Sequence, residues 1–282
     1  MHMISPLLLR STQVNSGQAQ DRRAESPLPP HDIRDLSSMK GRKIVISGAG
    51  RGLGRALAIV AASQGATPIL LGRSQSALQE VSETIKSDSG ATAYPIICDL
   101  SDPTSVAQAT KEIAESHPDI DILVNNGAHF TGDSFDKQTD DQIISVVSSA
   151  VTGTMLLTRQ LLPLLRQRPR ADIHNVVSMS GLQYARLTGA SLPFRAAKAA
   201  QDGFTQGLVE ELKGTFVRVT SVYPGLIEDV SPTSVEWQKE RGSHEGITNK
   251  NVVDTVIYAL SAPPNVSLRS IIIERTQSDF LV

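Results

Sequence analysis

Cysteine is nearly absent from this sequence: Cys98 is the only one among 282 residues. A single cysteine excludes an internal disulfide framework and cannot by itself form a cysteine-rich metal site. It also fits a reducing compartment, so the cytoplasm is the expected location and no metal centre is expected.

Long hydrophobic runs and an excess of basic charge are also missing. The longest apolar stretches, such as MLLTRQLLPLL (155–165), are interrupted by polar residues and fall short of the roughly 20 residues that span a bilayer. The 27 basic residues against 29 acidic residues give a net charge of −2, without the basic stripe that a phosphate backbone requires. We therefore expect neither a membrane segment nor a nucleic-acid partner.

Residues 1–40 differ in composition from the rest of the chain. They are rich in Ser, Gln, Arg and Pro and show no sustained apolar period, which predicts a disordered N-terminal extension before a folded domain at 41–282. The first twenty residues contain no acid and carry Arg10, so import into mitochondria is the alternative to a cytoplasmic location.

From Lys40 onward, short β-rich runs alternate with longer helical patterns. This alternation predicts a single doubly wound parallel sheet of seven strands with helices on both faces, a Rossmann-like α/β fold. The predicted strands are 43–48, 67–72, 92–98, 121–126, 172–178, 217–225 and 269–274. The predicted helices are 52–64, 76–87, one that starts at Ser101, Asp102 and Pro103, 139–167, one that begins within 191–204, and one near 249–261.

The stretch SGAGRGLG (47–54) follows the first predicted strand and opens the first helix. Gly48 permits a tight turn, Gly52 lets the backbone approach a pyrophosphate, and Gly54 lets the helix pack closely on the sheet. Leu53 lies in the same turn and is also expected to contact the cofactor. The position of this loop, between a strand and a helix, predicts nucleotide binding.

Two arginines bear on which nucleotide would bind. The second predicted strand ends in Gly72 and Arg73, where an acid would bind an unmodified ribose, and Arg51 lies within the glycine loop. Two guanidinium groups at the 2′ position favour a phosphate there, so we expect NADP(H) rather than NAD(H).

The glycine loop is one of several motifs by which the sequence resembles the short-chain dehydrogenase/reductase family over nearly all of residues 41–275. The markers are the glycine loop, Asp99 and Leu100, NNGA (125–128), VVSMSG (176–181), Lys198 and YPGLIED (223–229). The resemblance implies that Asp99 and Leu100 contact adenine and that Asn125 and Gly127 flank the adenosine ribose. It also implies that Pro224, Gly225 and Ile227 border the nicotinamide and that Lys198 contacts its ribose.

The family's chemistry uses an Asn, a Ser, a Tyr and a Lys, and the resemblance assigns Ser178 and Lys198 to two of these roles. Phe194 stands at the position of the Tyr, one helical turn before Lys198, and Ala150 at that of the Asn. Tyr184 is the first candidate for a substitute proton donor, and His129 is another because its unperturbed pKa lies near neutrality. Asp229 occupies a position where the family commonly has Thr, and it is a candidate acceptor for the nicotinamide carboxamide.

Three functions follow from this mixture of retained and missing residues. The first is an NADP(H)-dependent oxidoreductase that acts on a ketone, alcohol or enone of a small molecule, with enone reduction less dependent on the missing phenol. The second is a non-redox cyclase, isomerase or dehydratase on the same scaffold. The third is a catalytically silent NADP(H)-binding protein. The resemblance also implies a homodimer or homotetramer that pairs through the long helix and the helix that follows it.

Overall fold

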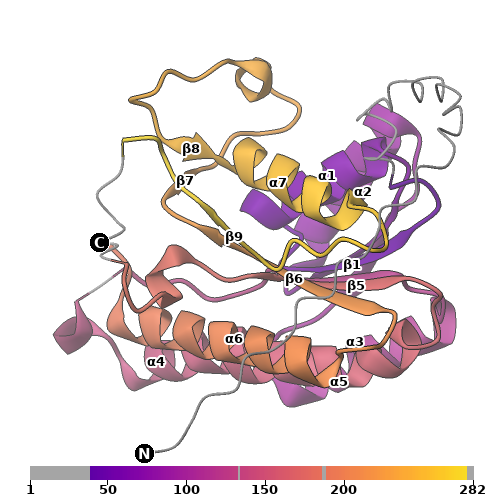
Figure 1. Ribbon diagram of the computed structural model, residues 1–282, viewed down its shortest axis with the longest axis horizontal. Helices are drawn as coiled ribbons and strands as arrows, with labels where there is room; N and C mark the ends of the chain where they lie inside the picture. Colours follow the sequence, from indigo (N-terminus) through magenta and orange to yellow (C-terminus); the bar gives the residue numbers. More distant parts are fainter. Residues whose placement is uncertain (1–38, 133, 186–188, 278–282) are drawn as a thin grey trace, which may run out of the picture. The chain divides into compact units, whose positions relative to one another are not determined.

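The computed structural model describes residues 39–132, 134–185 and 189–277 (Figure 1). The extension expected at residues 1–40 lies outside this range except for Met39 and Lys40. Met39 is fully buried in the hydrophobic core with Ile44 and Ile46, so residue 39 is already part of the packed domain.

A seven-stranded sheet, parallel throughout, forms the centre of the described chain, in the order β3-β2-β1-β4-β5-β6-β9. The doubly wound fold expected from the sequence is therefore confirmed. The strands are β1 (Lys43–Ser47), β2 (Thr67–Gly72), β3 (Tyr94–Ile97), β4 (Ile122–Asn125), β5 (Ala171–Val176), β6 (Val217–Pro224) and β9 (Ser270–Ile273). The strand order reverses between β1 and β4, where sheets of this type bind their ligands.

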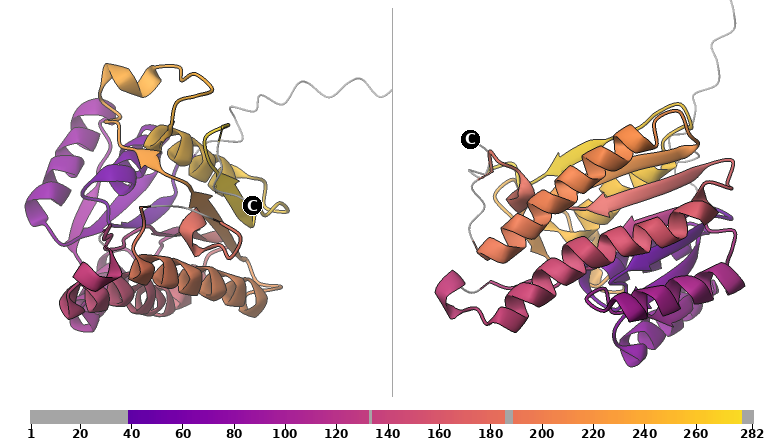
Figure 2. Two further views of the ribbon diagram at one scale, coloured as in Figure 1. Left: turned by 90° about the vertical axis from the view of Figure 1, so that its left-hand side faces the viewer. Right: turned by 90° about the horizontal axis from the view of Figure 1, so that it is seen from below.

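Helices cover both faces of the sheet (Figure 1), with α1, α2 and α7 on one face and α3 to α6 on the other. Figure 2 shows α5 and α6 side by side along the second face. The helices are α1 (Gly52–Ser63), α2 (Gln75–Ser89), α3 (Pro103–Ser116), α4 (Asp140–Val147), α5 (Thr154–Leu165), α6 (Leu192–Glu211) and α7 (Asn249–Ser261).

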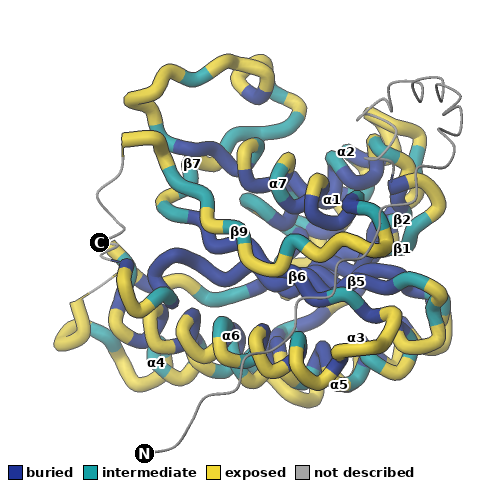
Figure 3. The backbone as a smooth tube through the Cα atoms, viewed as in Figure 1, coloured by how far each residue is buried: buried dark blue, intermediate teal, exposed yellow. Residues whose placement is uncertain are grey.

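Two apolar clusters fill the space on either side of the sheet. The central strands are buried along their length, as the dark-blue tube in Figure 3 shows, which explains their near-continuous runs of Val, Ile and Leu. A parallel strand covered by helices on both faces has no solvent side, so its sequence does not alternate between polar and apolar residues. None of the helices in the described part is both long and apolar enough to cross a bilayer.

The structure departs from the predicted elements in two places. The helix expected over 139–167 is divided by a π-helical turn at Ser148–Gly153, where Gly153 packs so closely on Leu100 that a Cβ would overlap the Leu100 carbonyl. A two-stranded sheet of β7 (Ile227–Glu228) and β8 (Ile247–Thr248) was not predicted, because two residues are too short to show a period.

Candidate functional site

The carboxyl ends of β1, β4, β5 and β6 meet at one edge of the sheet, and most of the predicted site residues lie there. Ser47 connects the first two of these ends, because its Oγ accepts hydrogen bonds from the backbone N–H groups of Asn126 at 3.0 Å and Gly127 at 2.9 Å. The Asn126 side chain donates to the Ser47 carbonyl at 2.9 Å. Asn126 thus holds the glycine loop against the end of β4, a role that the sequence motif did not reveal.

The glycine loop has the backbone that its sequence predicts. Gly48 and Gly52 adopt positive φ angles of 69° and 54°, which side chains disfavour. Gly54 lies so close to the loop that a Cβ would overlap the Gly48 carbonyl oxygen. At Gly127, a Cβ would lie 2.7 Å from Leu100 Cδ1, so these positions have no space for a side chain.

The amino terminus of α1 lacks the usual capping groups. Its N-cap residue, Arg51, makes no side-chain capping hydrogen bond, and the first turn of the helix contains no acid. The first N–H groups of a helix have no partner within the helix and carry a partial positive charge. This terminus is therefore suited to an anion such as a pyrophosphate.

Arg51 and Arg73 lie beyond the ends of adjacent parallel strands, Arg51 after β1 and Arg73 after β2. Both side chains are exposed, and neither forms an ion pair with another residue in the described part of the chain. Arg55 in α1 differs, because its guanidinium pairs with Glu80 at 3.2 Å. Arg51 and Arg73 thus have their charges available for an anionic ligand.

Asp229 brings a negative charge to the same loop. A Cβ on Gly52 would lie 3.2 Å from Asp229 Oδ2, which places this carboxylate beside the amino terminus of α1. A carboxylate beside this terminus would repel a pyrophosphate bound there.

Asn125 and Asp99 already have protein partners. The Asn125 amide is buried and donates to Thr158 Oγ1 at 2.9 Å and Asn175 Oδ1 at 2.8 Å. The Asp99 carboxylate accepts from the backbone and the hydroxyl of Ser101. These contacts support the strand ends from inside, and any ligand contact by Asn125 would come from its backbone.

A cavity of about 270 Å³ opens at the same edge of the sheet. Five of the residues expected at a nicotinamide or substrate site line it: Ser178, Lys198, Pro224, Gly225 and Ile227. The other lining residues are Asn126, Ala128, Phe130, Val176, Val177, Gly189, Ala190, Phe194 and Leu226. The wall is predominantly apolar with a few polar groups, as is common for small-molecule sites.

Lys198 is buried in the wall of this cavity. Its Nζ donates to the Val176 carbonyl at 2.9 Å and to Gln201 Oε1 at 2.7 Å. Burial lowers the pKa of Lys198 to about 7, because the charged form loses its hydration. An ammonium has three donors, so one N–H remains after these two bonds.

Phe194 lies on the same face of α6, where Lys198 Nζ is 5.5 Å from the centre of its ring. The ring also meets Phe130 edge to face, with centroids 5.0 Å apart. This side of the cavity is therefore hydrocarbon, apart from a weak cation–π contact.

The Ser178 hydroxyl is held at the end of β5. Its Oγ accepts hydrogen bonds from the backbone N–H of Ser180 at 3.2 Å and from Ser180 Oγ at 3.0 Å. The Ser178 proton has the Pro224 carbonyl as its acceptor at 3.5 Å, a long contact that a ligand oxygen could replace.

Tyr184 and His129, the two candidate proton donors, are not among the residues that line the cavity. Tyr184 does not line the cavity among the described residues, and 51% of its surface is exposed. His129 also lies outside the wall, and its Nδ1 forms a 2.6 Å hydrogen bond with Ser145 Oγ in α4. Neither side chain therefore contacts the cavity in this structure, and their roles as substitute proton donors stay predictions.

Comparison with known proteins agrees with this fold. A family model described as "short chain dehydrogenase" matches residues 42–241. An uncharacterized oxidoreductase from Staphylococcus saprophyticus is 28% identical over 236 residues, which cover 84% of this chain and 98% of that protein.

Solved structures are similar at lower identity. L-sorbose reductase from Gluconobacter frateurii, complexed with NADPH and L-sorbose, has a TM-score of 0.73 at 20% identity and covers 86% of this chain and 99% of its own. An alcohol dehydrogenase from the archaeon Thermococcus sibiricus, complexed with 5-hydroxy-NADP, has a TM-score of 0.72 at 20% identity, covering 84% and 98% of the two chains. At this identity the similarity supports the fold.

Proposed function

The chain belongs to the short-chain dehydrogenase family, and from this premise we propose that it is an NADP(H)-dependent oxidoreductase acting on a ketone, alcohol or enone of a small organic molecule. One observation carries the proposal. Ser178 and Lys198 line a largely apolar cavity at the same sheet edge as an uncapped helix terminus and a glycine loop that excludes side chains.

The residues at this edge fit a dinucleotide phosphate. The positions of Gly48 and Gly54 leave room for backbone only, and the N–H groups of the first turn of α1 lack a capping side chain. Arg51 and Arg73 would hold the 2′-phosphate. Because the Asp229 carboxylate opposes the pyrophosphate, the affinity for NADP(H) depends strongly on these two arginines.

When bound, NADP(H) supplies or accepts the hydride. The Ser178 hydroxyl would donate a hydrogen bond to the substrate oxygen in place of its long contact with Pro224. Reduction of a ketone also requires a proton donor, and the Phe194 side chain has no ionisable group that could serve as one. The remaining N–H of the Lys198 ammonium is the proposed proton source, since its pKa of about 7 matches neutral conditions.

The assignment of Phe194 to the position of the missing proton donor predicts a gain of function. We expect Phe194→Tyr to raise the rate of NADPH-dependent ketone reduction by about 10²-fold, because a general acid typically contributes 10²- to 10⁴-fold. The measurement is the loss of NADPH absorbance under saturating ketone.

Phe130→Tyr is the matched control, because Phe130 lines the same cavity but does not lie on α6 beside Lys198. It should leave the rate within about threefold of wild type. Equal gains in the two variants, or no gain in Phe194→Tyr, would contradict the assignment.

The role of Lys198 predicts a pH profile. The ammonium is present below its pKa of about 7 and is lost above it, so kcat for ketone reduction should be level in acid and fall about tenfold per pH unit above neutrality. Alcohol oxidation, which needs a base, should show the opposite trend. Lys198→Met should abolish the transition, and a level profile across neutrality in the native enzyme would exclude this role.

Two other functions are distinguished by the same assays. The contacts of Lys198 with Val176 and Gln201, together with the bare Phe194 ring, also suit a catalytically silent NADP(H)-binding protein. Such a protein would bind NADPH in calorimetry without oxidising it across a panel of ketones, alcohols and enones.

Product formation with no change in cofactor absorbance would indicate the second alternative, a non-redox cyclase, isomerase or dehydratase. Absence of NADP(H) binding would refute the proposed function itself.

A homodimer or homotetramer is part of the proposal. Exposed apolar side chains on α4 and at the start of α6 provide a surface for such pairing, among them Ile144, Val147 and Leu192.

A further inference from the structure

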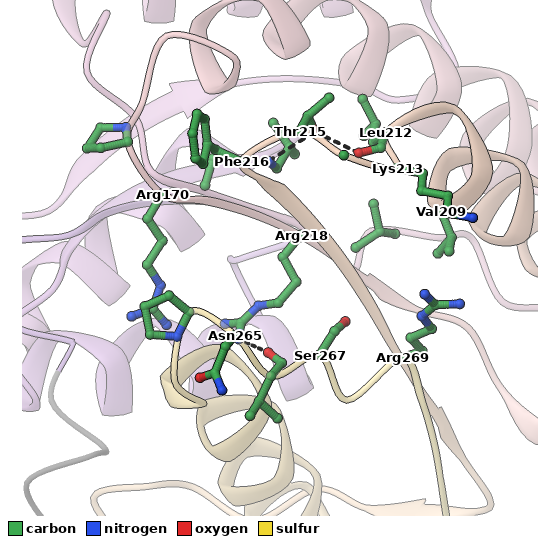
Figure 4. Close-up of a pocket in the computed structure, with 17 residues that line it drawn as sticks. Arg170, Val209, Leu212, Lys213, Thr215, Phe216, Arg218, Asn265, Ser267 and Arg269 are labelled. Carbon is green, nitrogen blue, oxygen red and sulfur yellow. Dashed lines mark hydrogen bonds between the residues drawn. The ribbon is translucent and has the colours of Figure 1, made fainter.

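A second cavity, of about 310 Å³, lies at the opposite edge of the sheet from the proposed active site. Its wall includes the first residues of β5 and β6, Ala171 and Val217, whereas the proposed active site is at the carboxyl ends of these strands. The end of α6, the turn that leads into β6 and the segment between α7 and β9 complete the wall (Figure 4). No part of the proposed function uses this cavity.

The charge of the wall has one sign. Arg170, Lys213, Arg218 and Arg269 all line the cavity, and the described residues of its wall include no Asp or Glu. Figure 4 shows the four side chains around the hollow, contributed by the ends of three different elements and the segment that precedes β9. Four cations around one cavity repel one another, and a bound anion would lower that repulsion.

The nearest buried acid does not balance this charge. Asp172 is fully buried and pairs with Arg218 at 2.5 Å and Arg42 at 2.6 Å, while Arg170 Nε is 4.0 Å away. One carboxylate therefore faces three guanidinium groups. Backbone carbonyls at and after the end of α7 accept from these arginines and offset part of the excess. The Leu260 carbonyl accepts from Arg42, Arg170 and Arg218, and the Ala262 carbonyl from Arg170 and Arg218. Arg218 also donates to the carbonyls of Pro263 and Val266.

Arg170 is the least well compensated of these three arginines. Its Nε is buried and has no hydrogen-bond partner within the described structure. Burial lowers the pKa of Arg170, and the charges of Arg42 and Arg218 lower it further, while Asp172 opposes them in part. An anion in the cavity would reduce this unfavourable interaction.

The rim offers two more cations and an aromatic surface. Lys213 and Arg269 are exposed, and neither forms an ion pair with another described residue. Phe216 in the same wall is 76% exposed, and Val209, Leu212 and Val266 add apolar surface. A ligand that suits this wall would combine negative charge with an apolar group.

We propose that this cavity binds a small organic dianion, such as a phosphate monoester, whose apolar group packs on Phe216. The anionic end would bind at Lys213 and Arg269, whose exposed ammonium and guanidinium groups would donate charge-assisted hydrogen bonds. The site is independent of the nucleotide site because the two lie at opposite ends of β5 and β6.

Calorimetric titration of the full chain with phenyl phosphate, in saturating NADPH, tests this proposal. NADPH fills any competing phosphate site at the glycine loop, so binding that persists belongs elsewhere. The double variant Lys213→Gln/Arg269→Gln should weaken phenyl phosphate binding by about a hundredfold, since each lost contact involves a charged group. Phenol should not bind, and Phe216→Ala should weaken phenyl phosphate binding by about tenfold while leaving inorganic phosphate unaffected.

The matched control is Lys111→Gln/Lys239→Gln, which removes the same net charge from exposed lysines elsewhere on the surface. These lysines pair with Glu115 and Glu236, and their loss should leave phenyl phosphate binding unchanged. The proposal is overturned by absence of binding, by equal losses in the two double variants, or by binding that NADPH abolishes. Because NADPH binding is measured separately, a failure here is distinguishable from a failure of the proposed function.

Discussion

Replacing both Arg51 and Arg73 with glutamine should weaken NADPH binding by about 10²-fold while NADH binding changes by less than about threefold. A hydrogen bond to a charged group is worth about 1.5–3 kcal/mol, and the low end applies here because both side chains are exposed. Two such contacts with the 2′-phosphate sum to about 3 kcal/mol. NADH lacks this phosphate, so it loses only a weak long-range attraction.

Calorimetry with both cofactors on the double variant and on Arg55→Gln measures this effect. Arg55 lies in the same helix but pairs with Glu80, so its replacement should change neither affinity appreciably. An unchanged NADPH affinity in the double variant would refute the 2′-phosphate contact. Equal losses for NADPH and NADH would assign the arginines to the pyrophosphate instead.

Substitution of Gly54 by alanine should destabilise the fold by about 3 kcal/mol and abolish detectable dinucleotide binding. The added Cβ would overlap the Gly48 carbonyl oxygen and approach Asn126 Nδ2 at 2.6 Å. Backbone on one side and the amide that joins β1 to β4 on the other cannot both move away. The start of α1 must shift, and its N–H groups then leave the position that the pyrophosphate requires.

Gly203→Ala provides the control for this prediction. Gly203 lies within α6, and no atom outside its local chain lies within 4 Å of the Cβ that alanine would add. Alanine there should stabilise the protein by about 0.5–1 kcal/mol through its helix propensity. Urea denaturation of both variants gives the free energies of unfolding, and a Gly54→Ala variant as stable as Gly203→Ala would contradict the packing argument.

The local sequence was sufficient for the architecture. Each buried parallel strand must be apolar on both faces, and each covering helix must be apolar on one face. Short apolar runs therefore alternate along the chain with longer segments of helical periodicity. The proximity of Phe194 and Lys198 was predictable for the same reason, because positions four apart on a helix share a face. The glycine loop was also predictable, since its positive φ angles and close contacts exclude side chains.

Sequence reasoning was least successful in the loops. Tyr184 follows a short turn after β5, where no periodicity determines the direction of a side chain, so the sequence provided no basis for placing it relative to the cavity. The π-helical turn at Ser148–Gly153 packs through Gly153 on Leu100, more than fifty residues earlier in the chain. A one-dimensional pattern contains no information about such a contact.

The order of strands and helices, the glycine turn and the shared face of Phe194 and Lys198 were thus determined by the sequence alone, because each follows from local geometry within a few residues. Only the tertiary structure brought Asp229 against Gly52 and placed Arg170, Lys213, Arg218 and Arg269 around one cavity. Charges that are far apart in the chain interact through space, so their balance is decided when the strands and helices pack together.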